Sequence, residues 1–207
     1  FRVGLSVGKM SVIIFLPIFA RKTFGVSPLA IGGIHAGGKL SKAALQGWMG
    51  RLADSRFEEH RLVLGGALLY AFGTATIPLA LVAEGAITPI PVRVMGRSTT
   101  ITGAIIALFI AYAILGVADS MRLPASMSLF IQEGEEFDSA ASSMSLRSIS
   151  WKIGQVSGPV IVGVIKEFVS TTAAFLSAAG IIFLASIAFV VSYGQARRAG
   201  ESLHVDE

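Results

Sequence analysis

Four polar side chains recur on one otherwise apolar stretch, residues 28–49: His35, Lys39, Lys42 and Gln46. At about 3.6 residues per turn, their spacing places all four on one narrow face of an α-helix. A lysine that faces lipid costs about 2.5–3.5 kcal/mol on insertion scales, so this face must point to protein or to a wet cavity. There it could bind an anionic group or stabilise a change of protonation. The alternative is that the lysines snorkel to an interface or pair structurally.

Two further charged residues, Lys9 and Asp119, lie inside apolar stretches. Lys9 is a candidate for the same cavity, with snorkelling to the membrane edge as the alternative. Asp119 could take and release a proton, whereas Arg122, three residues later, permits a local ion pair at a helix end. Tyr112 and Ser126 share one helix face with Asp119. The remaining cavity candidates lie on the stretch 143–165: Trp151, Lys152 and Gln155. A tryptophan in a membrane protein is more often a packing or interface anchor, so that role stays open for Trp151.

Small residues on the same stretch predict close helix packing. Gly154, Gly158 and Gly163 recur at a spacing that offers a flat face to a neighbouring helix. Pro159 follows Gly158 and removes a backbone donor, which frees a carbonyl and bends the helix. This pair would give a moving bundle a pliable element, although simple close packing explains the glycines as well.

The composition indicates a membrane protein. Of the 207 residues 53% are hydrophobic and only 14% are charged, whereas soluble domains carry about 25% charged residues. The net charge of +4 without a dense Lys/Arg run does not favour nucleic-acid binding. The chain has no cysteine, and its three histidines, His35, His60 and His204, are far apart, so we expect no metal. No nucleophile or phosphate-loop motif occurs either, so we expect neither an enzyme nor a cofactor.

Long apolar runs without period-2 alternation predict an all-α, polytopic membrane protein. Runs of about 20 residues suffice to cross a bilayer. We expect one domain, 1–207, with a polar C-terminal tail at 192–207 and six spans near 3–20, 28–49, 62–82, 101–120, 143–165 and 172–191. The fourth span can extend past Pro124 to Phe130, and a loop is expected at 84–100. Lys and Arg are more frequent on the side that carries both termini, which predicts cytoplasmic termini in a multi-pass protein of the cell membrane.

Four stretches carry a resemblance to a known family: Phe15-Leu16-Pro17 with Phe24-Gly25-Val26-Ser27-Pro28, Gly50-x-Leu52-Ala53-Asp54-x-Arg56, Gly116 through Pro124-Ala125, and Gly154-x-x-x-Gly158-Pro159-x-x-x-Gly163. In this order the chain resembles one six-helix half of a major facilitator superfamily transporter. The loop at Gly50, Asp54 and Arg56 is similar to the family's signature loop, which implies a gating role; an ordinary charged cytoplasmic loop is the alternative. The signature departs from the usual form after Arg56, which favours the C-terminal half.

The resemblance implies a permease or efflux protein that moves a small organic or drug-like solute by alternating access. The excess of buried Lys over buried Asp favours an anionic or polar organic solute, and His35 and Asp119 suggest coupling to protons. The expected partners are the lipid bilayer, the solute, protons, and a missing N-terminal half or a second copy of the chain. The alternatives are a non-transporting remnant or scaffold and a half-size homodimeric transporter.

Overall fold

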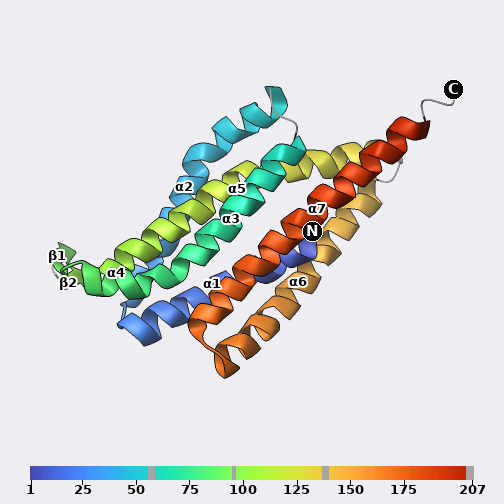
Figure 1. Cartoon of the computed structure of the whole chain (residues 1–207). Helices are drawn as coiled ribbons and strands as arrows, with labels where there is room; N and C mark the ends of the chain where they lie inside the picture. The colour runs from blue at the N-terminus through green and yellow to red at the C-terminus, as the bar shows by residue number, and fades with distance from the viewer. Residues whose placement is uncertain (56–58, 95–96, 137–139, 204–207) are drawn as a thin grey trace.

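The computed structural model of the chain describes residues 1–55, 59–94, 97–136 and 140–203. Six helical rods fill nearly all of it (Figure 1). The third rod consists of two α-helices joined by a 3₁₀ turn at Pro78. The rods are α1 (Arg2–Phe24), α2 (Pro28–Ser55), α3–η1–α4 (Glu59–Thr76, Ile77–Leu79, Ala80–Ala86), α5 (Gly103–Glu136), α6 (Ala140–Phe168) and α7 (Thr171–Leu203).

The rods coincide with the six stretches that the sequence predicts, and most of them extend beyond the expected limits. Helix α5 passes through Pro124, and α7 continues to Leu203, so much of the stretch expected as a polar tail is helical. The turn between α1 and α2 has a local cause. Gly25 ends α1 in the left-handed region at φ 64°, which glycine adopts without steric cost, and Pro28 then opens α2.

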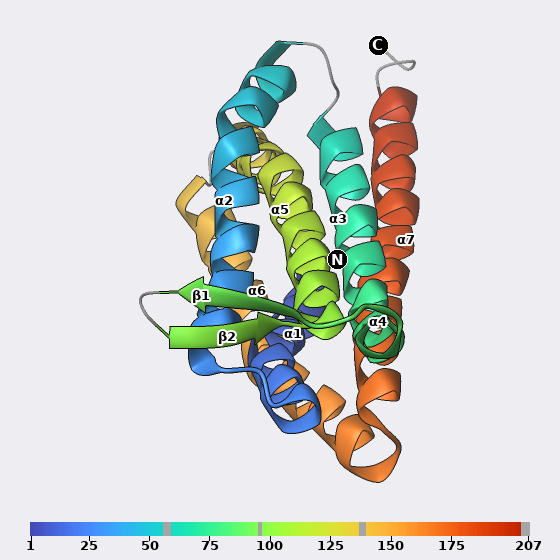
Figure 2. The same cartoon turned by 90° about the vertical axis from the view of Figure 1, so that its left-hand side faces the viewer.

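A short antiparallel hairpin stands where the sequence predicted a loop. Strand β1 (Ile90–Val94) pairs with β2 (Arg97–Ile101), with Ile90 opposite Ile101. Prolines at 89 and 91 suggested an irregular segment, but a proline can occupy an edge strand, and the β-branched residues of both strands favour extended backbone. The hairpin lies at one end of the bundle, in front of α2 and α5 in Figure 2.

The five most extensive contacts between rods form a pattern that stays the same when the first three rods are exchanged with the last three. The most extensive contacts join α2 to α5, α3 to α5 and α1 to α6, followed by α3 to α7 and α1 to α7. When α1, α2 and α3 are exchanged with α5, α6 and α7, the contact α2–α5 corresponds to α1–α6, and the contact α3–α5 corresponds to α1–α7. Between these pairs lies one large apolar core cluster, to which Leu16, Phe19, Leu108 and Phe175 contribute.

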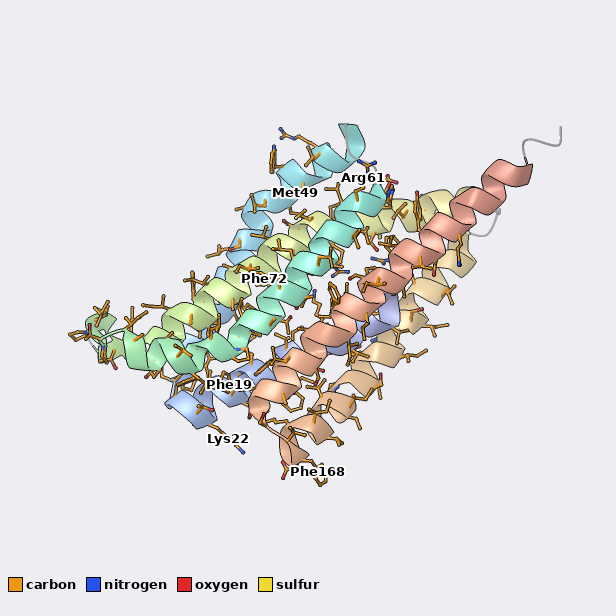
Figure 3. The ribbon with its side chains drawn as sticks, in the orientation of Figure 1. Phe19, Lys22, Met49, Arg61, Phe72 and Phe168 are labelled. Atoms are coloured by element: carbon orange, nitrogen blue, oxygen red, sulfur yellow. The ribbon has the colours of Figure 1, made fainter. Side chains whose placement is uncertain are left out.

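Four rods are long and apolar enough to cross a membrane: Arg2–Phe24, Glu59–Ala86, Gly103–Leu129 and Thr171–Gln195. Helices α2 and α6 are also long, but they carry more polar residues, among them the stripe on α2. Large apolar side chains are exposed on the outside of the bundle, including Phe72 (59% exposed) and Phe168 (82%), both labelled in Figure 3. Such a surface suits lipid, because water-soluble monomers rarely expose large contiguous apolar patches.

Candidate functional site

Three charged side chains form an ion-pair cluster inside the bundle. The carboxylate of Asp119, on α5, accepts hydrogen bonds from the ammonium of Lys9, on α1, and from Nη2 of Arg122 at 2.8 Å. The side chains of Lys9, Asp119 and Arg122 are 14%, 12% and 1% exposed. Apart from one hydrogen bond between Arg2 and Ser126, helices α1 and α5 make few other contacts. The cluster is therefore an electrostatic link between two parts of the bundle.

Two aromatic rings lie near the ammonium group of Lys9. It lies 5.6 Å from the ring centroid of Tyr70, on α3, and 5.8 Å from that of Trp151, on α6. Both distances allow a cation–π attraction, which is worth more where water is scarce. Lys9 therefore interacts with side chains from α3, α5 and α6 at once.

A small open cavity of about 80 Å³ adjoins this cluster. Four of the predicted cavity residues line it together: Lys9, Lys39, Lys42 and Asp119. The rest of its wall consists of two tyrosines, two glycines and two apolar residues: Tyr70, Tyr112, Gly38, Gly116, Ile13 and Leu115. Lys39 and Lys42 reach the cavity because α2 lies directly on α5 at Gly38 and Gly116, where a Cβ on Gly116 would come within 2.1 Å of the Gly38 carbonyl oxygen.

The other cavity candidates do not line this cavity in the described part of the chain. His35 packs edge-on against Tyr112, with ring centroids 4.6 Å apart, so it lies next to the cavity wall. Trp151 is linked to the site through Lys9. Gln46 and Lys152 are exposed, and Gln155 is half-buried.

A second polar group ties α1 to α6 and α5, and the sequence did not predict it. Arg2 donates from Nη1 to Ser126 Oγ at 3.0 Å and from Nε to the Arg147 carbonyl at 3.2 Å. Ser6 Oγ donates to the carbonyl of Trp151 at 2.7 Å. Tyr70 at the main cluster was also missed. A tyrosine within an apolar span is the kind of signal that could have indicated it, because its hydroxyl needs a polar neighbour.

The glycines predicted to pack do lie on close contacts. A Cβ on Gly154 or Gly158 would come within 2.5 Å of the carbonyl oxygen of Val3 or Val7, on α1. At Gly163 the nearest atom is 3.2 Å away, in the ring of Phe15. Pro159 lies within α6 without ending it. The α1–α6 contact is therefore a seam of backbone against backbone.

The predicted gating loop lies only partly within the described residues. Gly50 is a half-buried residue of α2, whereas the side chain of Asp54 and all of Arg56 lie outside the described part. Directly after the loop, Glu59 accepts a hydrogen bond from Ser128 Oγ, and His60 stacks on Tyr193 with ring centroids 4.4 Å apart. The start of α3 is thus attached to both α5 and α7.

Two further features bear on what the site can do. A larger apolar hollow of about 560 Å³ lies between the start of α2, β2 and α5, and its lining includes Leu29, Ile101 and Phe109. Across the described residues, no three His, Cys, Asp or Glu side chains are grouped as metal ligands would be. The lysines, the carboxylate and the tyrosines that line the charged cavity can offer ion pairing, hydrogen bonding and cation–π contacts to a solute.

Searches of curated proteins and of solved structures give no significant match. The profile of the Major Facilitator Superfamily, in contrast, matches residues 3–204. This match spans all six rods, and it confirms the family resemblance of the sequence motifs. The chain belongs to the Major Facilitator Superfamily, whose members are membrane transporters rather than enzymes.

Proposed function

We propose that the chain forms one six-helix half of a secondary transporter, which moves a small organic or drug-like solute by alternating access. The observation that carries the proposal is the Lys9–Asp119–Arg122 cluster beside an open cavity in an apolar bundle. Charged groups inside a membrane bundle are costly, so they mark solute or ion pathways more often than they serve packing. In this proposal α2 and α6 cross the bilayer with the other four rods, and both termini are cytoplasmic in the cell membrane.

The partner in this proposal is a second six-helix half, either an N-terminal one in the same protein or another copy. Two observations support it. The cavity is open on one side and holds only about 80 Å³, so a second bundle would complete it. On α6, an exposed apolar stripe at helical spacing offers a surface on which the second bundle can pack, whereas in this proposal lipid covers the other exposed apolar faces; the stripe consists of Ile149, Ile153, Val156, Val160 and Val164.

Solute counterflow tests the function. The full-length protein is reconstituted in liposomes, and exchange is measured over a panel of anionic, neutral and cationic organic compounds. Exchange of at least one class supports the proposal. Its absence for every class, with protein that is folded in the same liposomes, favours the non-transporting scaffold.

Water access tests the cavity directly. The 207 residues contain no cysteine, so single cysteines at 35 and 39 can be labelled with a water-soluble maleimide. We expect labelling at both positions in at least one transport state. We expect none at 72, because Phe72 lies on the outside of the bundle, which faces lipid in this proposal. If neither 35 nor 39 reacts in any state, no aqueous pathway reaches the stripe.

Coupling to protons is a separate part of the proposal, and it rests on Asp119 and His35. Protonation of Asp119 would release Lys9 and Arg122 from their shared counter-ion and so change the contacts that link α1 to α5. Proton flux in proteoliposomes should fall strongly in Asp119→Asn. Flux equal to the wild type would remove Asp119 from this role.

A further inference from the structure

We propose that the cavity binds the anionic head group of its solute and that the carboxylate of Asp119 competes with this head group for the ammonium group of Lys9. This inference rests on the proposed transport function and adds the chemical class of the solute.

The cavity wall has an excess of positive charge. Three lysines, Lys9, Lys39 and Lys42, line it against one carboxylate, Asp119. That carboxylate already accepts hydrogen bonds from two cations, Lys9 and Arg122. Within the described part of the chain, neither Lys39 nor Lys42 has a carboxylate at ion-pair distance. The positive charges without a counter-ion therefore belong to Lys39 and Lys42, which line the cavity from α2 beside Asp119.

A buried arginine adds a further positive charge behind the carboxylate of Asp119. Arg122 is 1% exposed, and its Nε has no acceptor among the described residues, although one Nη donates to Asp119. Arg122 is not among the residues that line the cavity, so it adds positive charge behind Asp119 and makes no direct contact with the space. A cationic solute, by contrast, would have to displace two cations from the only carboxylate on the cavity wall that the structure describes, and it would leave both buried without a counter-ion.

Size limits what enters. The cavity is partly open and has a volume of only about 80 Å³, which suits a small head group such as a carboxylate with a short carbon stem. The head group of the solute therefore occupies the cavity while the remainder stays at the open side. Inside the cavity the anionic head group competes with the carboxylate of Asp119 for the ammonium group of Lys9. Removing the negative charge of Asp119 should therefore strengthen anion binding.

Three probes of matched size separate charge from shape: propionate, propionamide and propylammonium. The full-length protein in zwitterionic nanodiscs is titrated with each, and the shift of the thermal unfolding midpoint gives the apparent Kd. We expect propionate to stabilise the protein more than the other two probes. In Asp119→Asn the Kd for propionate should fall about tenfold, because one competing charge is gone. Weaker propionate binding in this variant would overturn the proposal.

A second variant keeps the proposal testable if Asp119→Asn does not fold. Lys42 is half-buried on α2 and lies outside the ion-pair cluster, so Lys42→Gln should preserve the bundle while weakening propionate binding about threefold. The matched control is Lys22→Gln, at the exposed end of α1 (Figure 3), which should bind propionate as the wild type does. An unchanged Kd in Lys42→Gln would contradict the assignment.

An anionic lipid head group offers the same chemistry as a soluble carboxylate, so a parallel arm uses nanodiscs with anionic lipid. Stabilisation by lipid alone, dependent on Lys42, would overturn the solute assignment. Preferential binding of propylammonium would also reject the anion class, while counterflow of cations would leave the transport function standing. Counterflow of no compound at all would reject the transport function itself.

Discussion

The seams α1–α6 and α2–α5 occupy equivalent places in the bundle, yet they are built differently. In α2–α5 both helices contribute a glycine, and a Cβ on Gly116 would lie 2.1 Å from the Gly38 carbonyl oxygen. In α1–α6 both glycines belong to α6, and a Cβ on Gly154 or Gly158 would lie 2.5 Å from a carbonyl oxygen of α1. We call α2–α5 the two-sided seam, because both helices contribute a glycine, and α1–α6 the one-sided seam, because only α6 does.

The difference relates packing to the site. Gly38 and Gly116 line the charged cavity, so the two-sided seam is what brings the lysine stripe of α2 to Asp119. The one-sided seam leaves α1 free to carry side chains at the contact, and Ser6 uses this to bond the Trp151 carbonyl at 2.7 Å. Glycine on both helices gives the closest approach, whereas glycine on one helix gives close approach together with a polar side chain on the other.

Among substitutions at the two seams, the largest effect should come from Gly116→Ala. The added methyl would collide with backbone of α2, which cannot turn aside as a side chain can, so the two helices must separate. We expect a loss of about 3 kcal/mol of stability, at the upper end of the range for overpacking. Thermal unfolding in nanodiscs measures it, with Gly180→Ala as the control, because open space surrounds a Cβ there. Equal midpoints for the two variants would refute the two-sided seam.

Gly158→Ala should have the second largest effect. Its Cβ would meet the Val7 carbonyl oxygen at 2.5 Å and the Val7 Cα at 2.8 Å, so α1 must move by less than α2 does in the first variant. We expect a loss of about 2 kcal/mol by the same measurement. Gly163→Ala is the matched control on the same helix, since its nearest neighbour is the ring edge of Phe15 at 3.2 Å. A larger loss at 163 than at 158 would contradict the seam.

Local sequence patterns predict much of this arrangement. The six predicted apolar runs coincide with the six rods, and four of these rods are long and apolar enough to cross a membrane. The spacing of Gly154, Gly158 and Gly163 indicated a packing face on α6, and the offset from Asp119 to Arg122 permitted the local pair that the structure contains. These features depend only on residues within one helix.

The pairing of Lys9 with Asp119 could not be read in the same way. The two residues are 110 positions apart, and no periodicity states which helices are neighbours. The position of Tyr70 beside Lys9 could not be predicted for the same reason, because it follows from the packing of α3 on α5. The hairpin was missed for a local reason, because its prolines outweighed its β-branched residues in the interpretation of the loop.

Ser6→Ala tests the polar contact of the one-sided seam. The variant removes the hydrogen bond to the Trp151 carbonyl without changing the backbone contact, so we expect a loss of about 1 kcal/mol. Ser11→Ala is the matched control, because that buried hydroxyl bonds only to Val7, within its own helix. The midpoint should fall further for Ser6→Ala than for Ser11→Ala, and the reverse order would mean that the bond between helices adds nothing.

The smallest effect, with the opposite sign, is expected for Gly47→Ala. Gly47 lies on α2 beyond the two-sided seam and is exposed, with nothing within 4 Å of an added Cβ. Alanine is the better helix former by about 1 kcal/mol, so the unfolding midpoint should stay level or rise slightly. A clear fall in the full-length protein would mean that another segment packs on α2 at this point. Gly47 would then mark a contact with the proposed partner half, as Gly116 marks the contact between α2 and α5. If that is the cause, the fall should occur in the full-length protein and be absent from the isolated 207-residue chain.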